Sequence, residues 1–141
     1  MEQRDYLIRQ IEQFGQVLGK VLFDLLGLKN KGDISESIEF TTRLLISELD
    51  VDLEKLVSIK RDELIDALIC KKGFNNENLE ILAEILMQTG DNYFKIKNLH
   101  KGEIFCQTSL TIYEYLDKSD KTYSFDRKEK MKSLITLLSS S

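Results

Sequence analysis

The sequence contains no proline, only one histidine and only two cysteines among its 141 residues. Proline breaks the interior of an α-helix, so a chain without it can form long, uninterrupted helices. The histidine, His100, has no cysteine or second histidine nearby at the spacing that a zinc site uses. Neither a phosphate-binding glycine loop nor a local nucleophile motif occurs. We therefore expect no metal ion, no cofactor and no catalytic residue, and we interpret the protein as a non-enzyme.

The two cysteines and the net charge indicate the cellular compartment and the kind of partner. Cys70 and Cys106 fit neither a disulfide framework nor a metal-binding motif, so we interpret both as small buried side chains in a reducing compartment. The formal net charge is -4, and an acidic chain lacks the cationic field that attracts phosphates. Acidic residues in the first five positions argue against a signal peptide. These features predict a cytoplasmic protein that does not bind nucleic acid.

Apolar residues recur at intervals of three and four along most of the chain, which is the spacing of one face of an α-helix. We predict an all-α fold of antiparallel helix hairpins in one domain covering residues 1–141. Residues 1–30 would hold a long N-terminal helix, residues 33–73 a helical middle, and residues 76–138 repeat-like helices. Charged residues interrupt the apolar band of the first helix, which argues against a transmembrane span. Peripheral association of this helix with a membrane is the weaker alternative, because its polar face is not notably basic.

Turn and capping residues set the expected helix boundaries. Asp33 is the expected N-cap of the second helix, and Glu36 stands three residues on, as in a capping box. Asp62 is the expected cap of a later helix that Gly73 would end. The last helix is expected to begin near Ser124.

Residues 83–117 carry the pattern of a pair of helices. A large apolar residue, a glycine and a tyrosine stand in the first helix, and small residues stand in the second. Small residues let two antiparallel helices approach closely, and a tyrosine can fill the gap beside them. The segment resembles a tetratricopeptide repeat, which is a helix hairpin of about 34 residues. The residues at matching positions are Leu86, Gly90, Tyr93, Gly102 and Ser109.

The segment also departs from the family pattern. Thr89 replaces a leucine, Cys106 replaces an aromatic residue, and the closing proline is missing. The helix from Ser124 would begin a second repeat, and the N-terminal half would serve as the cap that such arrays need. The whole pattern, with its opening at residues 4–11 and the repeat-like hairpin at its end, is also similar to an uncharacterised bacterial family of small helical proteins. That resemblance brings no known activity with it.

The resemblance implies a protein-interaction module of unknown partner. The first helix of the hairpin would line the partner-binding groove with Met87, Asp91, Phe94 and Lys95. The alternative is that Met87 and Phe94 simply pack in the core.

A second hypothesis is a homodimer formed through the N-terminal helix. Its apolar band looks wider than one flank of a small domain needs, and large exposed apolar patches tend to be interfaces. The dimer face would consist of Phe14, Leu18, Leu22 and Leu25. The alternative is that this helix lies centrally and is buried on most sides. A third hypothesis, an enzyme whose site is built from scattered residues, would show as a cleft of carboxylates with shifted pKa values.

Overall fold

A computed structural model describes residues 2–140, with side chains from residue 9 onward, and every regular element in this range is helical. The predicted all-α class is therefore confirmed. In chain order the elements are α1 (Glu2–Asn30), α2 (Ile34–Leu49), α3 (Leu53–Leu56), α4 (Arg61–Asp66), the π-helical turn η1 (Ala67–Lys71), α5 (Asn76–Lys95), α6 (Leu99–Ser119) and α7 (Phe125–Ser139).

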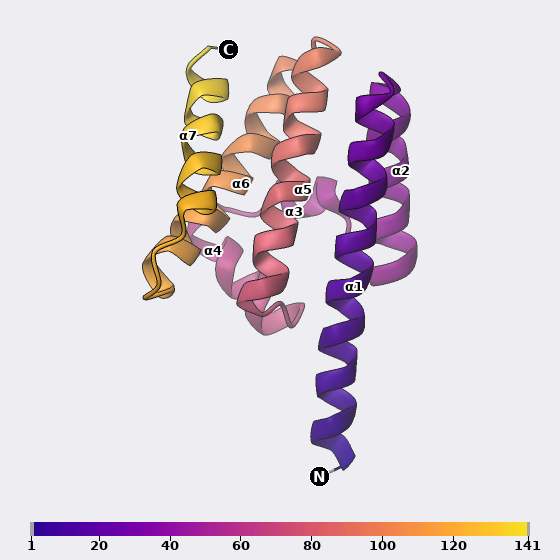
Figure 1. Cartoon of the computed structure of the whole chain (residues 1–141), viewed down its shortest axis with the longest axis vertical. Helices are drawn as coiled ribbons and strands as arrows, with labels where there is room; N and C mark the ends of the chain where they lie inside the picture. Colours follow the sequence, from indigo (N-terminus) through magenta and orange to yellow (C-terminus); the bar gives the residue numbers. More distant parts are fainter. Residues whose placement is uncertain (1, 141) are drawn as a thin grey trace.

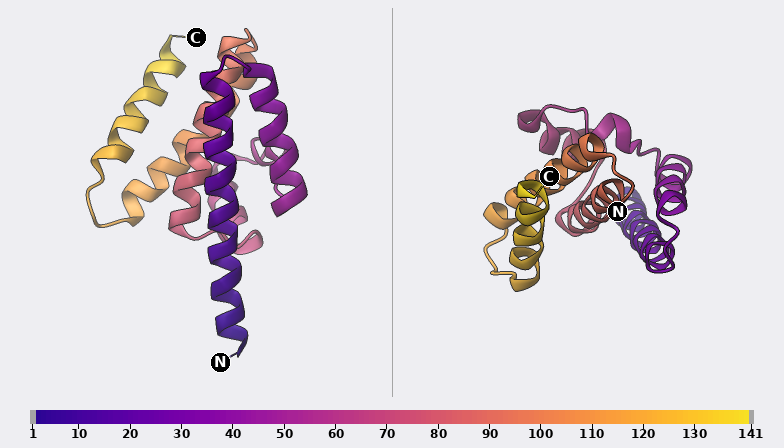
Figure 2. Two further views of the ribbon diagram at one scale, coloured as in Figure 1. Left: turned by 45° about the vertical axis from the view of Figure 1, so that its right-hand side comes forward. Right: turned by 90° about the horizontal axis from the view of Figure 1, so that it is seen from above.

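The long helices form two layers (Figure 1). Helices α1, α5 and α7 run in the same direction in the front layer, with α5 in the middle. Helices α2 and α6 run in the opposite direction behind them, and the short elements α3, α4 and η1 also lie at the back (Figure 2). Helix α5 packs against α1, α2 and α6, whereas α7 packs mainly on α6. The central position of α5 explains its many buried side chains.

Helix α1 is continuous, as the apolar spacing predicts, and it extends beyond the rest of the molecule. Its apolar stripe is buried from Leu18 through Val21 to Leu25. Residues 9–13 are exposed, and the first turns of α1 project past the other helices at the lower end of Figure 1. The single helix therefore has a buried C-terminal half and a projecting N-terminal end.

The turn between α1 and α2 corrects the predicted capping box. Asp33 is the N-cap residue, but its side chain makes no capping hydrogen bond. Gly32 has a φ angle of +86°, and the Asp33 N–H donates to the Leu28 carbonyl. Asp33 is therefore held by its backbone, and its carbonyl accepts from the Ser37 N–H at the start of α2.

The helical middle contains two further differences from prediction. Helix α4 begins at Arg61 with Lys60 in the N-cap position, so Asp62 lies inside the first turn. A carboxylate is still favourable there because of the helix dipole. Gly73, with a φ angle of +76°, ends this region as expected. Cys70 is exposed rather than buried, whereas Cys106 is buried, and both thiols are free.

Helices α5 and α6 approach each other closely because of two glycines. A Cβ atom on Gly90 would lie 2.6 Å from the Cys106 sulfur, and one on Gly102 would lie 2.7 Å from the Phe94 ring. The Ser109 hydroxyl donates to the Ala83 carbonyl of α5 at 2.6 Å. This geometry agrees with the physical reason given above for small residues at these positions.

Candidate functional site

The front layer contains a groove between α5 and α7, near their C-terminal ends. Its volume is about 480 Å³. Two apolar side chains, Met87 of α5 and Leu137 of α7, lie among polar ones. The remaining lining residues are Gln88, Asp91, Glu129, Lys132, Ser133 and Thr136. The groove therefore offers both apolar contacts and hydrogen-bonding groups to a molecule that lies in it.

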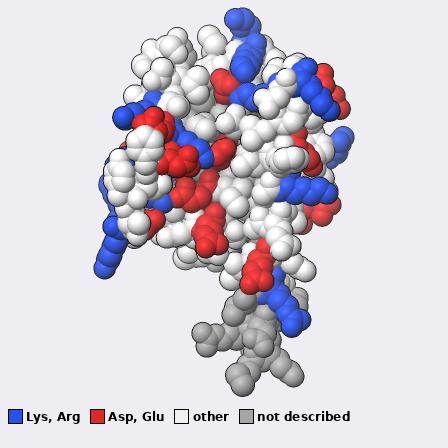
Figure 3. Space-filling model, in the orientation of Figure 1, with Lys and Arg blue, Asp and Glu red and all other residues white. Residues whose placement is uncertain are grey.

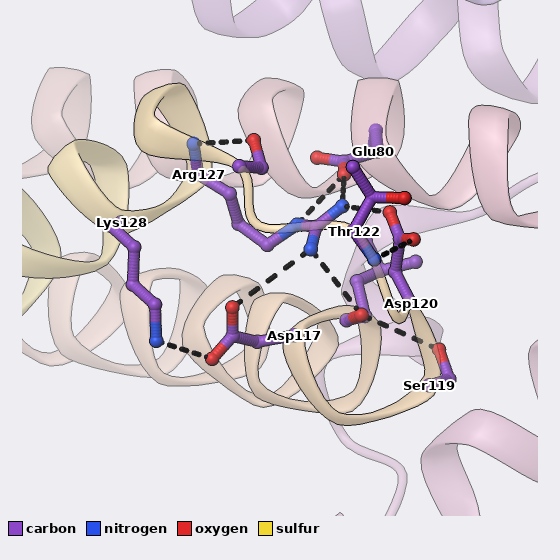
Figure 4. A network of polar contacts seen from close by, with 9 residues as sticks. Glu80, Asp117, Ser119, Asp120, Thr122, Arg127 and Lys128 are labelled. Atoms are coloured by element: carbon purple, nitrogen blue, oxygen red, sulfur yellow. Dashed lines mark hydrogen bonds and ion pairs between the residues drawn. The ribbon is translucent and has the colours of Figure 1, made fainter.

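Arg127 fixes the N-terminal end of α7 against the two helices beside it (Figure 4). Its side chain is only 4% exposed, and its guanidinium lies between Glu80 of α5 and Asp120 beyond the end of α6. The Nε atom donates to Glu80 Oε1 at 2.8 Å, and an Nη2 atom donates to Asp120 Oδ2 at 3.1 Å. A buried cation is tolerated only where anions and acceptors surround it, as they do here.

Neighbouring ion pairs extend this cluster along α7. Lys128 pairs with Asp117 of α6 at 2.6 Å, and Lys130 pairs with Glu84 of α5. Figure 3 shows acidic side chains gathered on this front face, over α5 and the start of α7. Because the pairs lie toward the N-terminal end of α7, they hold that end against α5 and leave the groove beyond them.

The Asp120 carboxylate is held in its ionised form. The N–H of Thr122 donates to Asp120 Oδ1 at 3.0 Å, and the Arg127 guanidinium donates to the other carboxylate oxygen, Oδ2. These two donors lower the pKa of Asp120, the Thr122 N–H contributing most. The buried Tyr113 hydroxyl has no hydrogen-bond partner among the described residues. Burial raises its pKa, and the charge of Glu84 adds to the effect. We interpret the ion pairs of Arg127, Lys128 and Lys130 as the contacts that hold α7 against α5 and α6.

A cation from α1 binds two of the α5 residues that line the groove. Lys29 donates to Gln88 Oε1 at 2.7 Å and to Asp91 Oδ2 at 2.6 Å, and its side chain is largely buried. Lys95 also approaches Asp91, at 3.5 Å. Asp91 is thus neutralised by residues from two helices, so the groove has no uncompensated charge at this point.

The four predicted groove residues lie in different places. Met87 and Asp91 line the groove between α5 and α7. Phe94 packs against Gly102 of α6 and belongs to the α5–α6 interface. Lys95 is half-exposed beside Asp91 but does not line the groove. The sequence does not predict the α7 residues that complete the groove, because α7 is separated from α5 by the whole of α6 and comes to lie beside α5 only in the folded chain.

The four predicted dimer-face residues are buried in the core of this chain or packed against it. Leu18 and Leu25 are completely buried. Phe14 and Leu22 are half-buried against the same core, and the Phe14 ring meets the Phe74 ring edge to face at 4.7 Å. Leu18 and Leu25 are therefore not accessible to a second copy in this fold, which agrees with the alternative of a centrally packed helix.

Reactive groups are few in the described part of the chain. Burial raises the pKa of the Cys106 thiol to about 12, so this sulfur is a poor nucleophile near neutral pH. His100 is exposed in the first turn of α6. Among the described residues, no group of three or more His, Cys, Asp or Glu side chains is placed to hold a metal ion.

A second hollow lies at the back, beside α3, α4 and η1. Its volume is about 1030 Å³. Four lysines and four acids line it together with apolar residues, so its charges balance and favour no one class of ligand. The charged residues are Lys55, Lys60, Lys71, Lys72, Asp50, Asp52, Glu63 and Asp66.

Comparison of the chain with protein-family models, with curated proteins and with solved structures gives no match. None of the helices in residues 2–140 combines the length and apolar character needed to cross a membrane.

Proposed function

We propose that this chain is a non-catalytic protein-interaction module that binds a segment of a partner protein in the groove between α5 and α7. The observation that carries the proposal is the composition of this groove, in which Met87 and Leu137 lie among uncharged polar and paired charged side chains. Apolar contacts give affinity to such a site, and the polar groups around them select the partner.

The resemblance to a tetratricopeptide repeat supports the same location. In that family the first helices of successive pairs line the binding groove. Here α5 is the first helix of the α5–α6 pair, and α7 follows α6 in the chain, as the first helix of a next pair would. A cytoplasmic location is part of the proposal, since both cysteines are unpaired thiols.

The ion-pair cluster supports the idea that the groove is preformed. Arg127 and Lys130 tie α7 to Glu80 and Glu84 of α5. A helix held in this way loses little freedom when a partner binds, so less of the binding free energy is spent on ordering the site.

The test compares capture of partner proteins from native lysate by three forms of the full chain. Thr136→Arg places a bulky side chain at an exposed groove position, and Gln107→Arg places the same side chain at an exposed position of α6 outside the groove. The proposal expects a partner that the wild type and Gln107→Arg retain and that Thr136→Arg loses by at least about tenfold. Equal retention by all three forms contradicts it. Circular dichroism must show that both variants are folded.

A further inference from the structure

A third hollow, of about 530 Å³, lies between the N-terminal half of α1 and the first turns of α5. We name it the α1–α5 hollow. It shares no lining residue with the groove between α5 and α7. Its lining residues are Ile11, Glu12, Gly15 and Gln16 of α1, the N-cap residue Asn75, and Glu77, Asn78 and Ile81 of α5.

The α1–α5 hollow is lined by a buried polar side chain without a partner. Asn78 is only 3% exposed, and its Nδ2 atom has no hydrogen-bond acceptor among the described residues. Its Oδ1 atom lies toward α1, because a Cβ atom added to Gly15 would stand only 2.8 Å from it. Gly15 thus leaves room for the amide against α1. A buried polar group without a partner lowers stability, so its presence in the lining of a hollow points to a group that binds there.

The second buried asparagine of α5 differs from Asn78 in this respect. The Oδ1 atom of Asn92 also lacks a partner in the described part of the chain. Its Nδ2 atom, however, donates to the Ser37 hydroxyl at 3.2 Å, and that hydroxyl donates to the Leu25 carbonyl at 3.0 Å. The Asn92 amide therefore joins α5 to α2 and α1, which explains a polar residue at that position without a ligand.

The charge of the α1–α5 hollow is negative and uncompensated. Glu12 and Glu77 line it, and no lysine, arginine or histidine does. Both glutamates are exposed, and neither forms an ion pair with another described residue. In the groove between α5 and α7, by contrast, Asp91 is paired with Lys29. Two unpaired carboxylates favour a cationic ligand.

The other lining residues indicate an organic cation with an apolar stem. No group of described residues is placed to hold a metal ion. Ile11 is 38% exposed and Ile81 is partly buried, so both offer apolar contact to the methylene groups of a long cationic side chain. A guanidinium has five N–H donors in one plane and can serve several acceptors at once, whereas an ammonium is a compact point charge.

We propose that the α1–α5 hollow binds the side chain of an arginine that projects from a partner protein. The guanidinium would lie by Glu12 and Glu77, and its methylene groups would contact Ile11 and Ile81. A carbonyl oxygen of the partner backbone is the matching acceptor for the Asn78 Nδ2 atom. This last contact favours an arginine in a protein over a free polyamine, which has no acceptor to offer.

The experiment titrates the isotope-labelled full chain with capped tripeptides at low ionic strength, where attraction between charges is least screened. The tripeptides are Ala-Arg-Ala, Ala-Lys-Ala and Ala-citrulline-Ala, and spermidine is added separately. Citrulline has the shape of arginine without its charge, and spermidine is a cation without a carbonyl group. The NMR signals of the Asn78 side-chain amide and of the Gly15 N–H report binding.

Two double variants distinguish this hollow from the rest of an acidic surface. Glu12→Gln with Glu77→Gln removes both charges of the hollow at exposed positions, so the fold should be kept. Glu36→Gln with Glu39→Gln is the matched control, because these two glutamates of α2 are also exposed and line neither this hollow nor the groove between α5 and α7. Circular dichroism checks the fold of both.

We expect Ala-Arg-Ala to shift both signals in the wild type and in the control, and to bind the variant of the hollow at least about tenfold more weakly. Ala-citrulline-Ala should leave both signals unchanged. Unshifted signals with Ala-Arg-Ala up to its solubility limit, or equal binding by the two double variants, overturn the proposal. Equal binding of Ala-Lys-Ala overturns the choice of a guanidinium, and tighter binding of spermidine overturns the partner protein as the source of the cation. The groove between α5 and α7 is not touched by these variants, so either proposal can fail without the other.

Discussion

Replacement of Gly90 by alanine tests the close approach of α5 and α6. An added Cβ would lie 2.6 Å from the Cys106 sulfur and 3.2 Å from both the Cys106 nitrogen and the Gly102 carbonyl oxygen. Two of these neighbours are backbone atoms, so the helices must separate slightly to accept it. Overpacking of this kind costs about 1–3 kcal/mol of unfolding free energy.

Alanine also favours the helix over glycine by about 0.5–1 kcal/mol, which offsets part of this cost. Gly90→Ala is therefore expected to lower the free energy of unfolding by about 1–2 kcal/mol. Gly19→Ala in α1 is the control. Beyond the backbone of its own helical turn, no described atom lies within 4 Å of a Cβ added at this position. It keeps the gain in helix propensity and should raise the free energy of unfolding by about 0.5–1 kcal/mol.

Urea unfolding followed by circular dichroism measures both changes. The Cys106→Ala background provides a further check, because it removes the sulfur and leaves only the two contacts at 3.2 Å. The cost of Gly90→Ala should fall by roughly half in that background, which a double-mutant cycle detects. A Gly90→Ala variant as stable as Gly19→Ala would refute the reasoning.

Three further predictions concern polar and reactive groups. Arg127→Met should lower the free energy of unfolding, measured with urea, by about 2 kcal/mol. The loss is smaller than for a fully buried ion pair, because water reaches the carboxylates left behind. An unchanged urea midpoint would contradict the role of Arg127 in holding α7. Folding lowers the pKa of Asp120, so its ionisation stabilises the fold at pH values above the ordinary pKa of 3.8. This stability is lost as the pH falls through the lowered pKa. An NMR titration of the Asp120 carboxyl with a midpoint at or above 3.8 would contradict the lowered pKa. With a thiol reagent near pH 8, the exposed Cys70 should react at once and the buried Cys106 only after denaturation. Rapid reaction of both thiols in the folded protein would contradict the burial of Cys106 between α5 and α6.

The long helices could be predicted from the sequence because apolar residues recur in each at intervals of three and four, although the repeat is weak in α7. Ser124, predicted as the start of the last helix, is its N-cap and accepts a hydrogen bond from the Arg127 N–H. The short helices of the middle region were harder, since α3 has four residues and α4 has six, too few to show a repeat. Asp33 shows that a residue suited to capping need not act through its side chain when the backbone turn already fixes the boundary. Asp62 shows that such a residue can also stand inside the first turn.

The candidate site could be predicted only in part. Met87 and Asp91 follow from their positions on the first helix of a hairpin, and both line the groove. The ion pair between Lys29 and Asp91 joins residues 62 positions apart, and no local sequence pattern predicts such a contact. The same holds for Lys132 and Thr136, which reach the groove through the packing of α7, held by the buried Leu134 and by Arg127.

Peptide selection on the full chain, followed by NMR of the methionine methyl groups, tests the groove most directly. Met87 lines the groove, whereas Met131 lies on the same helix as the groove residues of α7 without lining it. The proposed function predicts selected peptides that shift the Met87 methyl signal more than the Met131 signal and bind at least about tenfold more weakly to Thr136→Arg than to Gln107→Arg. Peptides that bind all three forms equally and leave the Met87 signal unchanged would contradict it.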